Sequence, residues 1–165
     1  MKPDAFTAAE FALKAVAPRP ACLFVGEFVA RNRQNVLIQT IKDLDNAGIG
    51  AQLVLAGIGT GEYERYLNDL ARLLGVQDRI RLVHDADPFT LTRLYLYCQY
   101  FLIAPGVRDA GNVLGDAVEH GCIPIIGSDS GAAFFDEVER VIRSTFASPT
   151  AFAAAHRERA RATTE

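Results

Sequence analysis

Near its start the chain carries an unbroken apolar run that ends at a glycine, Ala21-Cys22-Leu23-Phe24-Val25-Gly26. A continuous run without polar alternation is typical of a strand that helices cover on both faces of a parallel sheet. The apolar residues that follow it have helical spacing, at Val36, Leu37, Ile41 and Leu44. The sequence therefore predicts a strand at 21–25 and then a helix at 34–47, which Gly48 ends.

This alternation of strand and helix continues along the chain. Apolar runs predict four further strands, at 52–56, 79–83, 100–103 and 123–126. Helical spacing and flanking glycines or prolines predict the other helices, at 4–16, 62–74, 88–97, 111–120, 133–143 and from about 149. Five strands that alternate with helices predict an α/β fold, a Rossmann-like doubly wound parallel sheet of five to six strands with helices on both faces.

Length and composition limit the architecture. The chain has 165 residues, of which 50% are hydrophobic and 22% are charged, so it can bury the core of one domain but is too short for two. We divide it into a leading helix or linker at 1–18, a binding domain at 19–144 and a C-terminal helix at 145–165. The net charge of -3 argues against nucleic acid as a partner, because proteins that bind it need a basic face.

The cysteines and the N-terminus indicate the compartment. Cys22, Cys98 and Cys122 are odd in number and widely spaced, which excludes a disulfide framework and a zinc site, so we expect buried, reduced thiols. Residues 1–4 lack the layout of a signal peptide, and no apolar run reaches the ~20 residues that cross a bilayer. We therefore expect a cytoplasmic protein.

Ligands of doubly wound sheets bind outside the carboxyl ends of the strands, so the loops there are the candidate site. In the first of these loops, Gly26 permits a close approach of the backbone, and Arg31 and Arg33 bracket the start of the next helix. Guanidinium groups beside a helix N-terminus suit an anion such as a diphosphate. The alternative interpretation is a solvated basic turn.

The loops after the second and third strands give weaker signals. Gly57, Gly59 and Gly61 follow the second strand, but their spacing lacks the full dinucleotide-binding pattern, so a plain turn and a close approach to a ligand both fit. His84 follows the third strand and is either a hydrogen-bond donor in a cleft or a structural residue. We keep Gly57, Gly59 and His84 as candidate binding residues.

The loop after the fourth strand is the most informative. Pro105 stops the strand and is kept as a candidate binding residue, and the next helix begins at about residue 111. Its first amides can receive negative charge, at Gly111, Asn112, Val113 and Leu114. Asp116 lies one turn into this helix, where its carboxylate either accepts hydrogen bonds from sugar hydroxyls or complements the helix dipole.

These residues resemble a known family. Residues 112–126 are similar to the stretch N-V-L-L-E-A-M-A-x-G-x-P-V-I of the donor-binding, C-terminal half of GT-B glycosyltransferases, family 4 type, also called glycosyl transferases group 1. Further motifs of this family are resembled in the same order over residues 21–138, at 23–26, 35–41, 53–59, 79–82, 94–105 and 128–131. Each match is weak alone, and their order and spacing make the set specific.

The resemblance implies a retaining enzyme that transfers a hexose from a nucleoside-diphosphate sugar to an acceptor, in polysaccharide or glycolipid synthesis, with no metal or other cofactor. The family holds the sugar and the ribose with two carboxylates in an E-x7-E pattern, and Asp116 matches the second of them. The first falls on Arg108 when counted back from Asp116, and on Asp109 when counted from Pro105. Asp109 and Asp116 are therefore the candidate catalytic residues.

Two further positions depart from the family's pattern. Glu27 stands where the family has an Arg, and Asn32 stands where it has a Lys, although Arg31 and Arg33 flank Asn32. The first hypothesis is the nucleotide-sugar-binding half of a glycosyltransferase, inactive without an acceptor-binding half before it. The full-length protein would then associate peripherally with the inner face of a membrane. The second is a degenerate, non-catalytic interaction module. The third is an unrelated doubly wound nucleotide-binding protein, which the first loop does not favour.

Overall fold

The structure is a computed structural model that describes residues 19–59, 61–108, 111–128 and 133–146. These residues form one five-stranded sheet in the order β3-β2-β1-β4-β5, and every neighbouring pair of strands is parallel. The strands are β1 (Ala21–Val25), β2 (Gln52–Gly57), β3 (Ile80–His84), β4 (Tyr100–Ile103) and β5 (Ile123–Ile126). The order changes direction between β1 and β4, because the chain crosses from one outer strand, β3, to the far side of β1.

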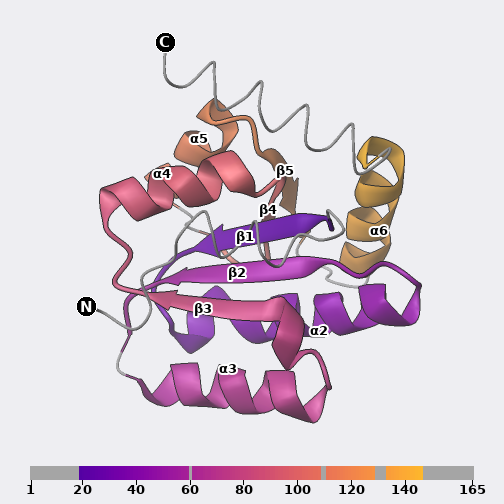
Figure 1. Ribbon diagram of the computed structural model, residues 1–165, viewed down its shortest axis with the longest axis horizontal. Helices are drawn as coiled ribbons and strands as arrows, with labels where there is room; N and C mark the ends of the chain where they lie inside the picture. Colours follow the sequence, from indigo (N-terminus) through magenta and orange to yellow (C-terminus); the bar gives the residue numbers. More distant parts are fainter. Residues whose placement is uncertain (1–18, 60, 109–110, 129–132, 147–165) are drawn as a thin grey trace.

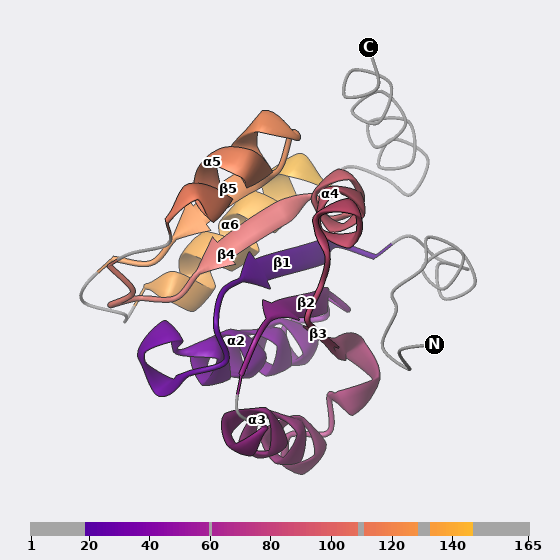
Figure 2. The same ribbon diagram turned by 90° about the vertical axis from the view of Figure 1, so that its left-hand side faces the viewer.

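Helices cover both faces of this sheet. They are α2 (Gln34–Asn46), α3 (Glu62–Leu73), α4 (Pro88–Tyr97), α5 (Asn112–Glu119) and α6 (Phe134–Thr145). Figure 1 and Figure 2 show α2 and α3 on one side of the strands and α4 and α5 on the other, and α6 contacts α2. Two 3-10 turns, η1 (Ala30–Asn32) and η2 (Gln77–Arg79), lie in the connections.

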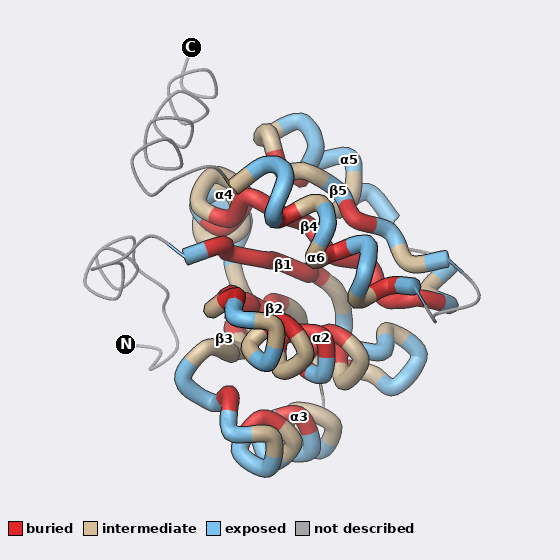
Figure 3. The backbone as a smooth tube through the Cα atoms, turned by 90° about the vertical axis from the view of Figure 1, so that its right-hand side faces the viewer, coloured by how far each residue is buried: buried red, intermediate tan, exposed pale blue. Residues whose placement is uncertain are grey.

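The core runs along the two central strands. Every residue of β1 and β4 is buried, as the tube in Figure 3 shows for β1. The rings of Phe24 and Phe101 meet between these strands with centroids 6.1 Å apart. This burial on both faces explains why the sequence has unbroken apolar runs rather than alternation.

The predicted fold class is confirmed, and the five predicted strands agree with the structure to within one residue at each end. The two 3-10 turns were not predicted. The predicted leading helix at 4–16, the segment 1–18 and the C-terminal helix from 149 lie outside the described residues. No helix among the described residues is long and apolar enough to span a membrane.

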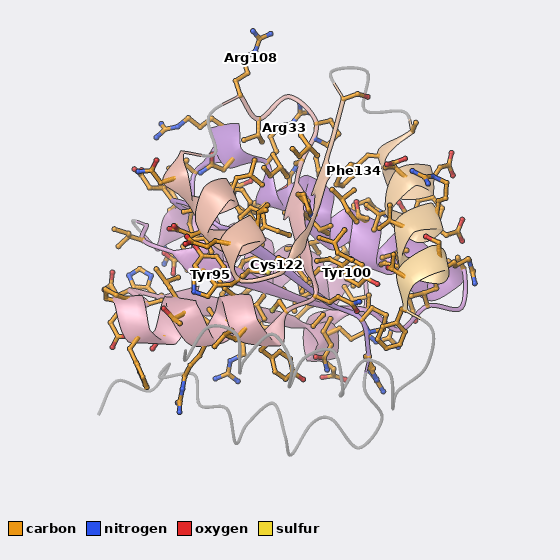
Figure 4. The ribbon with its side chains drawn as sticks, turned by 90° about the horizontal axis from the view of Figure 1, so that it is seen from above. Arg33, Tyr95, Tyr100, Arg108, Cys122 and Phe134 are labelled. Atoms are coloured by element: carbon orange, nitrogen blue, oxygen red, sulfur yellow. The ribbon has the colours of Figure 1, made fainter. Side chains whose placement is uncertain are left out.

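The three cysteines are buried and form no disulfide, as predicted. Burial raises the pKa of the Cys22 thiol to about 12. The Cys122 thiol donates to the backbone oxygens of Tyr95 and Cys98, each at 3.2 Å, and Figure 4 shows Cys122 beside Tyr95. The Cys122 thiol thus links the residue before β5 to the end of α4.

Candidate functional site

A cleft of about 490 Å³ opens where the strand order changes direction. It is formed by the loops that follow the adjacent strands β1 and β4. The loop after β1 leads to α2 on one face of the sheet, and the loop after β4 leads to α5 on the other face (Figure 1). Two such loops diverge and leave a crevice between them in open α/β sheets. We call it the carboxyl-edge cleft. The first loop lines it with Gly26, Glu27, Arg31 and Asn32, and the second with Gly106, Val107, Arg108 and Gly111.

The first loop is braced on the backbone of Glu27. The carbonyl oxygen of Glu27 accepts hydrogen bonds from Asn32 Nδ2 at 2.8 Å and from Gln34 Nε2 at 2.7 Å. Gln34 is fully buried at the start of α2, so this side chain anchors the loop to the helix. Asn32 therefore holds the loop, and its amide replaces the positive charge that the related family carries there.

The two predicted arginines of this loop have different roles in the structure. Arg33 adopts the left-handed conformation with φ 52°, and its Nη1 donates to the backbone oxygen of Pro105 at 3.0 Å. A Cβ on Gly106 would lie 2.6 Å from the same Nη1. Arg33 thus ties the β1 loop to the β4 loop, whereas Arg31 lines the cleft and pairs with Glu27 at 3.5 Å.

The charges of the cleft favour anions only partly. Arg31 and Arg108 line it, and Figure 4 shows Arg108 pointing away from the body of the molecule. Glu27 also lines the cleft, beside Arg31. The side chain of Glu27 is 60% exposed and that of Arg31 is 74% exposed. Two exposed guanidinium groups can contact a diphosphate, and Glu27 competes with it for Arg31.

Of the candidate residues at the start of α5, only the one that precedes the helix lines the cleft. Gly111 precedes the helix with φ 59° and ψ -150° and lines the cleft. The candidate residues that follow it do not line the cleft: Asn112, Val113, Leu114 and Asp116. Asp116 is exposed on α5, and its charge adds to the effect of burial that raises the pKa of Tyr95 to about 12. Asp109 lies outside the described residues.

The remaining candidate residues gather beside the cleft, at the ends of β2 and β3. A Cβ on Gly57 would lie 1.9 Å from the backbone oxygen of Gly26, so only glycine allows these two loops to pack. A Cβ on Gly59 would lie 2.7 Å from Glu64 Oε1 and 2.8 Å from Phe28 Cβ. Both glycines therefore have a packing role, and no sequence pattern indicated Phe28 or Glu64 as their neighbours.

His84 lies with these residues at the ends of β2 and β3 and does not line the carboxyl-edge cleft. Its Nδ1 lies 2.9 Å from Glu64 Oε2, and its Nε2 lies 3.5 Å from Asp85 Oδ2. Its ring stacks on that of Phe28 with centroids 6.3 Å apart. Among the described residues, no group of three or more His, Cys, Asp or Glu side chains is placed to hold a metal ion.

A second cleft of about 540 Å³ lies at the opposite edge of the sheet, and we call it the amino-edge cleft. It is lined by Arg19, Arg79 and Arg143 with apolar residues between them. Arg79 binds Asp45, and this guanidinium holds the pKa of Asp45 below its ordinary value. Arg143 donates to the backbone oxygen of Ala47 at 2.9 Å and pairs with Glu139 at 3.2 Å. Two of its three arginines are thus used within the fold.

The family model described as "Glycosyl transferases group 1" matches residues 6–139. No curated protein sequence matches the chain. The structure is similar to the catalytic domain of cholesterol-alpha-glucosyltransferase from Helicobacter pylori, with a TM-score of 0.66 and 16% identity over 88% of this chain and 97% of that chain. It is similar to sucrose-phosphate synthase from Thermosynechococcus elongatus, with a TM-score of 0.67 and 20% identity over 93% of this chain and 43% of that chain.

The Anabaena protein HepE, solved in complex with UDP and glucose, is also similar, with a TM-score of 0.63 and 14% identity. That match covers 94% of this chain and 46% of HepE. The chain thus spans less than half the length of two of these three structures. At such low identities the three structures share the fold with this chain, and the family model covers most of its length. The chain belongs to the glycosyl transferases group 1 family.

Proposed function

We propose that this chain is the C-terminal, donor-binding half of a retaining glycosyltransferase of family 4 type. It takes a nucleoside-diphosphate sugar and contributes to the transfer of a hexose to an acceptor, in polysaccharide or glycolipid synthesis. The observation that carries the proposal is the carboxyl-edge cleft, which lies where the strand order changes direction and which Arg31 and Arg108 line. A helix start follows each of its two loops, and helix N-termini attract phosphate groups.

In this proposal the residues of the cleft divide the donor between them. The glycines Gly26, Gly106 and Gly111 let the backbone approach the diphosphate, and Arg31 and Arg108 neutralise its charge. Asp116 stays the candidate for the ribose and Asp109 the candidate for the sugar. An acceptor-binding half, which precedes this one in our proposal, completes the reaction centre, so transfer by this chain alone is not expected. The enzyme works at the inner, cytoplasmic face of a membrane and uses no metal or other cofactor.

Titration calorimetry with a panel of UDP, GDP and ADP sugars tests the proposal. We expect heat from at least one donor, and we expect the R31A variant to bind it about tenfold more weakly, the loss of one charged contact. The matched control is R65A, because Arg65 is an exposed arginine on α3 that does not line the cleft. If no donor gives heat at millimolar concentration, the proposal of a donor site is wrong.

The second candidate function, a non-catalytic interaction module, is favoured by one observation. Glu27 places a carboxylate in the cleft and occupies Arg31. The triple variant E27R, N32K and R108E separates the two functions. If the site has merely decayed, the triple variant binds nucleotide sugars that the natural chain does not bind. If neither protein binds any of them, the interaction module is the better description.

A further inference from the structure

Four residues beside the carboxyl-edge cleft join three loops of the sheet, and we call them the His84 brace. They are His84 at the end of β3, Asp85 after it, Glu64 on α3 and Phe28 in the loop after β1. The imidazole contacts a carboxylate at each nitrogen, at 2.9 Å to Glu64 and 3.5 Å to Asp85. The rings of His84 and Phe28 lie nearly parallel, at 14°.

This arrangement suits the protonated imidazole. An ionised carboxylate only accepts hydrogen bonds, and a neutral imidazole donates through one nitrogen, whereas the imidazolium donates through both. The Glu64 side chain is only 16% exposed, and within the described residues its Oε1 has no hydrogen-bond partner. His84 is therefore an important partner of this mostly buried side chain, because a carboxylate that is buried without a partner is strongly destabilising.

The brace is connected to the cleft through Phe28. Phe28 is 1% exposed, and its amide donates to the backbone oxygen of Ile58 at 2.8 Å. The absence of a side chain at Gly59 leaves room for both Phe28 and Glu64. The neighbouring residue, Glu27, lines the cleft, and its carbonyl oxygen holds the side chains of Asn32 and Gln34. A displacement of Phe28 therefore displaces the wall of the cleft.

We propose that His84 is a positioning residue of the carboxyl-edge cleft, and that its imidazolium form holds Phe28, and with it the loop after β1, in the shape that receives an anionic ligand. Loss of the proton weakens the bond to Glu64 and loosens the loop. The protein with the imidazolium therefore binds an anionic ligand more tightly than the protein with the neutral ring. The ligand part of this inference rests on the proposed function, but the coupling of His84 to the loop does not.

Nuclear magnetic resonance tests the coupling without any ligand. We expect the amide resonances of Gly26 and Gly106 to move with the same midpoint as the ring resonances of His84. In the E64Q variant we expect the two amide resonances to stay nearly constant while the ring resonances of His84 still move. The amide of Val83, which precedes His84 on β3 and does not line the cleft, reports the effect of proximity alone in both proteins. The proposal is wrong if the resonances of the two cleft amides do not move with those of the His84 ring in the natural chain. It is also wrong if they still move with the ring resonances in E64Q.

Titration calorimetry with inorganic pyrophosphate tests the effect on binding. The H84Q variant is the reference, because its side chain does not titrate and its profile contains the ionisation of pyrophosphate itself. Relative to H84Q, we expect the affinity of the natural chain to fall about fivefold across the titration of His84, a coupling of ordinary size. H120Q is the matched control, since His120 also stacks on an aromatic ring, that of Tyr95, and does not line the cleft.

The two measurements separate the failure of the brace from the failure of the proposed function. Parallel profiles for the natural chain and H84Q overturn the role of His84 while leaving the anion site intact. If pyrophosphate binds at no pH, the proposed function fails, and the amide resonances alone then decide whether His84 positions the loop. A merely structural role for His84 would lower the stability of H84Q but would leave the pH profile unchanged.

Discussion

The two clefts of the molecule are similar in size and each contains arginines, yet the fold treats them differently. The carboxyl-edge cleft lies at the start of α2 and at the residue that precedes α5, whereas the amino-edge cleft lies at the ends of α2 and α6. Helix N-termini carry partial positive charge and C-termini partial negative charge. Arg79 and Arg143 at the amino edge contact acids and a helix end, whereas Arg31 at the carboxyl edge lies beside a helix start. Arginine content alone therefore does not distinguish the two clefts.

The largest expected effect distinguishes the glycines of the two edges. In G57A the new Cβ would lie 1.9 Å from the backbone oxygen of Gly26, and we expect a loss of about 3 kcal/mol in the free energy of unfolding. In G50A at the amino edge the nearest atoms lie at 3.9 and 4.0 Å, and we expect a change within about 0.5 kcal/mol. Urea denaturation measures both, and equal losses would contradict the distinction.

The next effect concerns anion binding at the two edges. We expect R31A to lower the affinity for inorganic pyrophosphate about tenfold, since a contact between charged groups is removed. R143A removes an arginine of the amino-edge cleft and should leave the affinity unchanged. Calorimetry at low ionic strength measures both values. A loss in R143A as large as that in R31A would mean that the clefts do not differ as anion sites.

A smaller effect is expected from the acid within the carboxyl-edge cleft. Glu27 pairs with Arg31 at 3.5 Å, and both side chains are mostly exposed. E27Q releases Arg31 and removes a like charge from the ligand, so the affinity for pyrophosphate should rise about threefold and less at high salt. The matched control is E139Q, whose acid pairs with Arg143 at the amino edge. Weaker binding in E27Q would show that Glu27 supports the ligand.

The smallest expected effect is a pH dependence at the amino edge. Arg79 is the first cause that lowers the pKa of Asp45 from its ordinary value of 3.8. A lowered pKa in the folded state adds stability that is present at neutral pH and is lost as the pH falls through that pKa. We expect D45N and R79Q to flatten the acid limb of stability against pH, followed by urea denaturation. The double variant should be no flatter than either single variant.

The sequence predicts the fold well because its signals are local. The unbroken apolar runs at β1 and β4 identify strands that are buried on both faces. Pro88 marks the start of α4, and Gly48 lies two residues after the end of α2. A switch point in the strand order is part of the doubly wound class, whereas the order β3-β2-β1-β4-β5 itself comes from the structure. None of these inferences needs to know which side chains meet in space.

The candidate site is predicted less completely because its contacts are long-range. The role of Arg33 depends on the backbone of Pro105, 72 residues away, so no local pattern could separate it from Arg31. His84 meets Glu64 across 20 residues, and the need for glycine at 57 depends on the path of another loop. The loops after β1 and β4, which the sequence indicates as candidates, do line the carboxyl-edge cleft, whereas the contacts within them are visible only in the structure.

The close approach of Gly57 to Gly26 has a consequence for local opening of the native state. The amide of Gly26 donates to Ala56, that of Phe28 to Ile58 and that of Asp85 to Gly57, at 2.8 to 2.9 Å. Because the backbones are in contact, one loop cannot detach without disturbing the others. In hydrogen exchange these three amides should behave as one cooperative unit that opens with a single free energy. We therefore expect the β1 side of the carboxyl-edge cleft to open together with the ends of β2 and β3, which do not line the cleft.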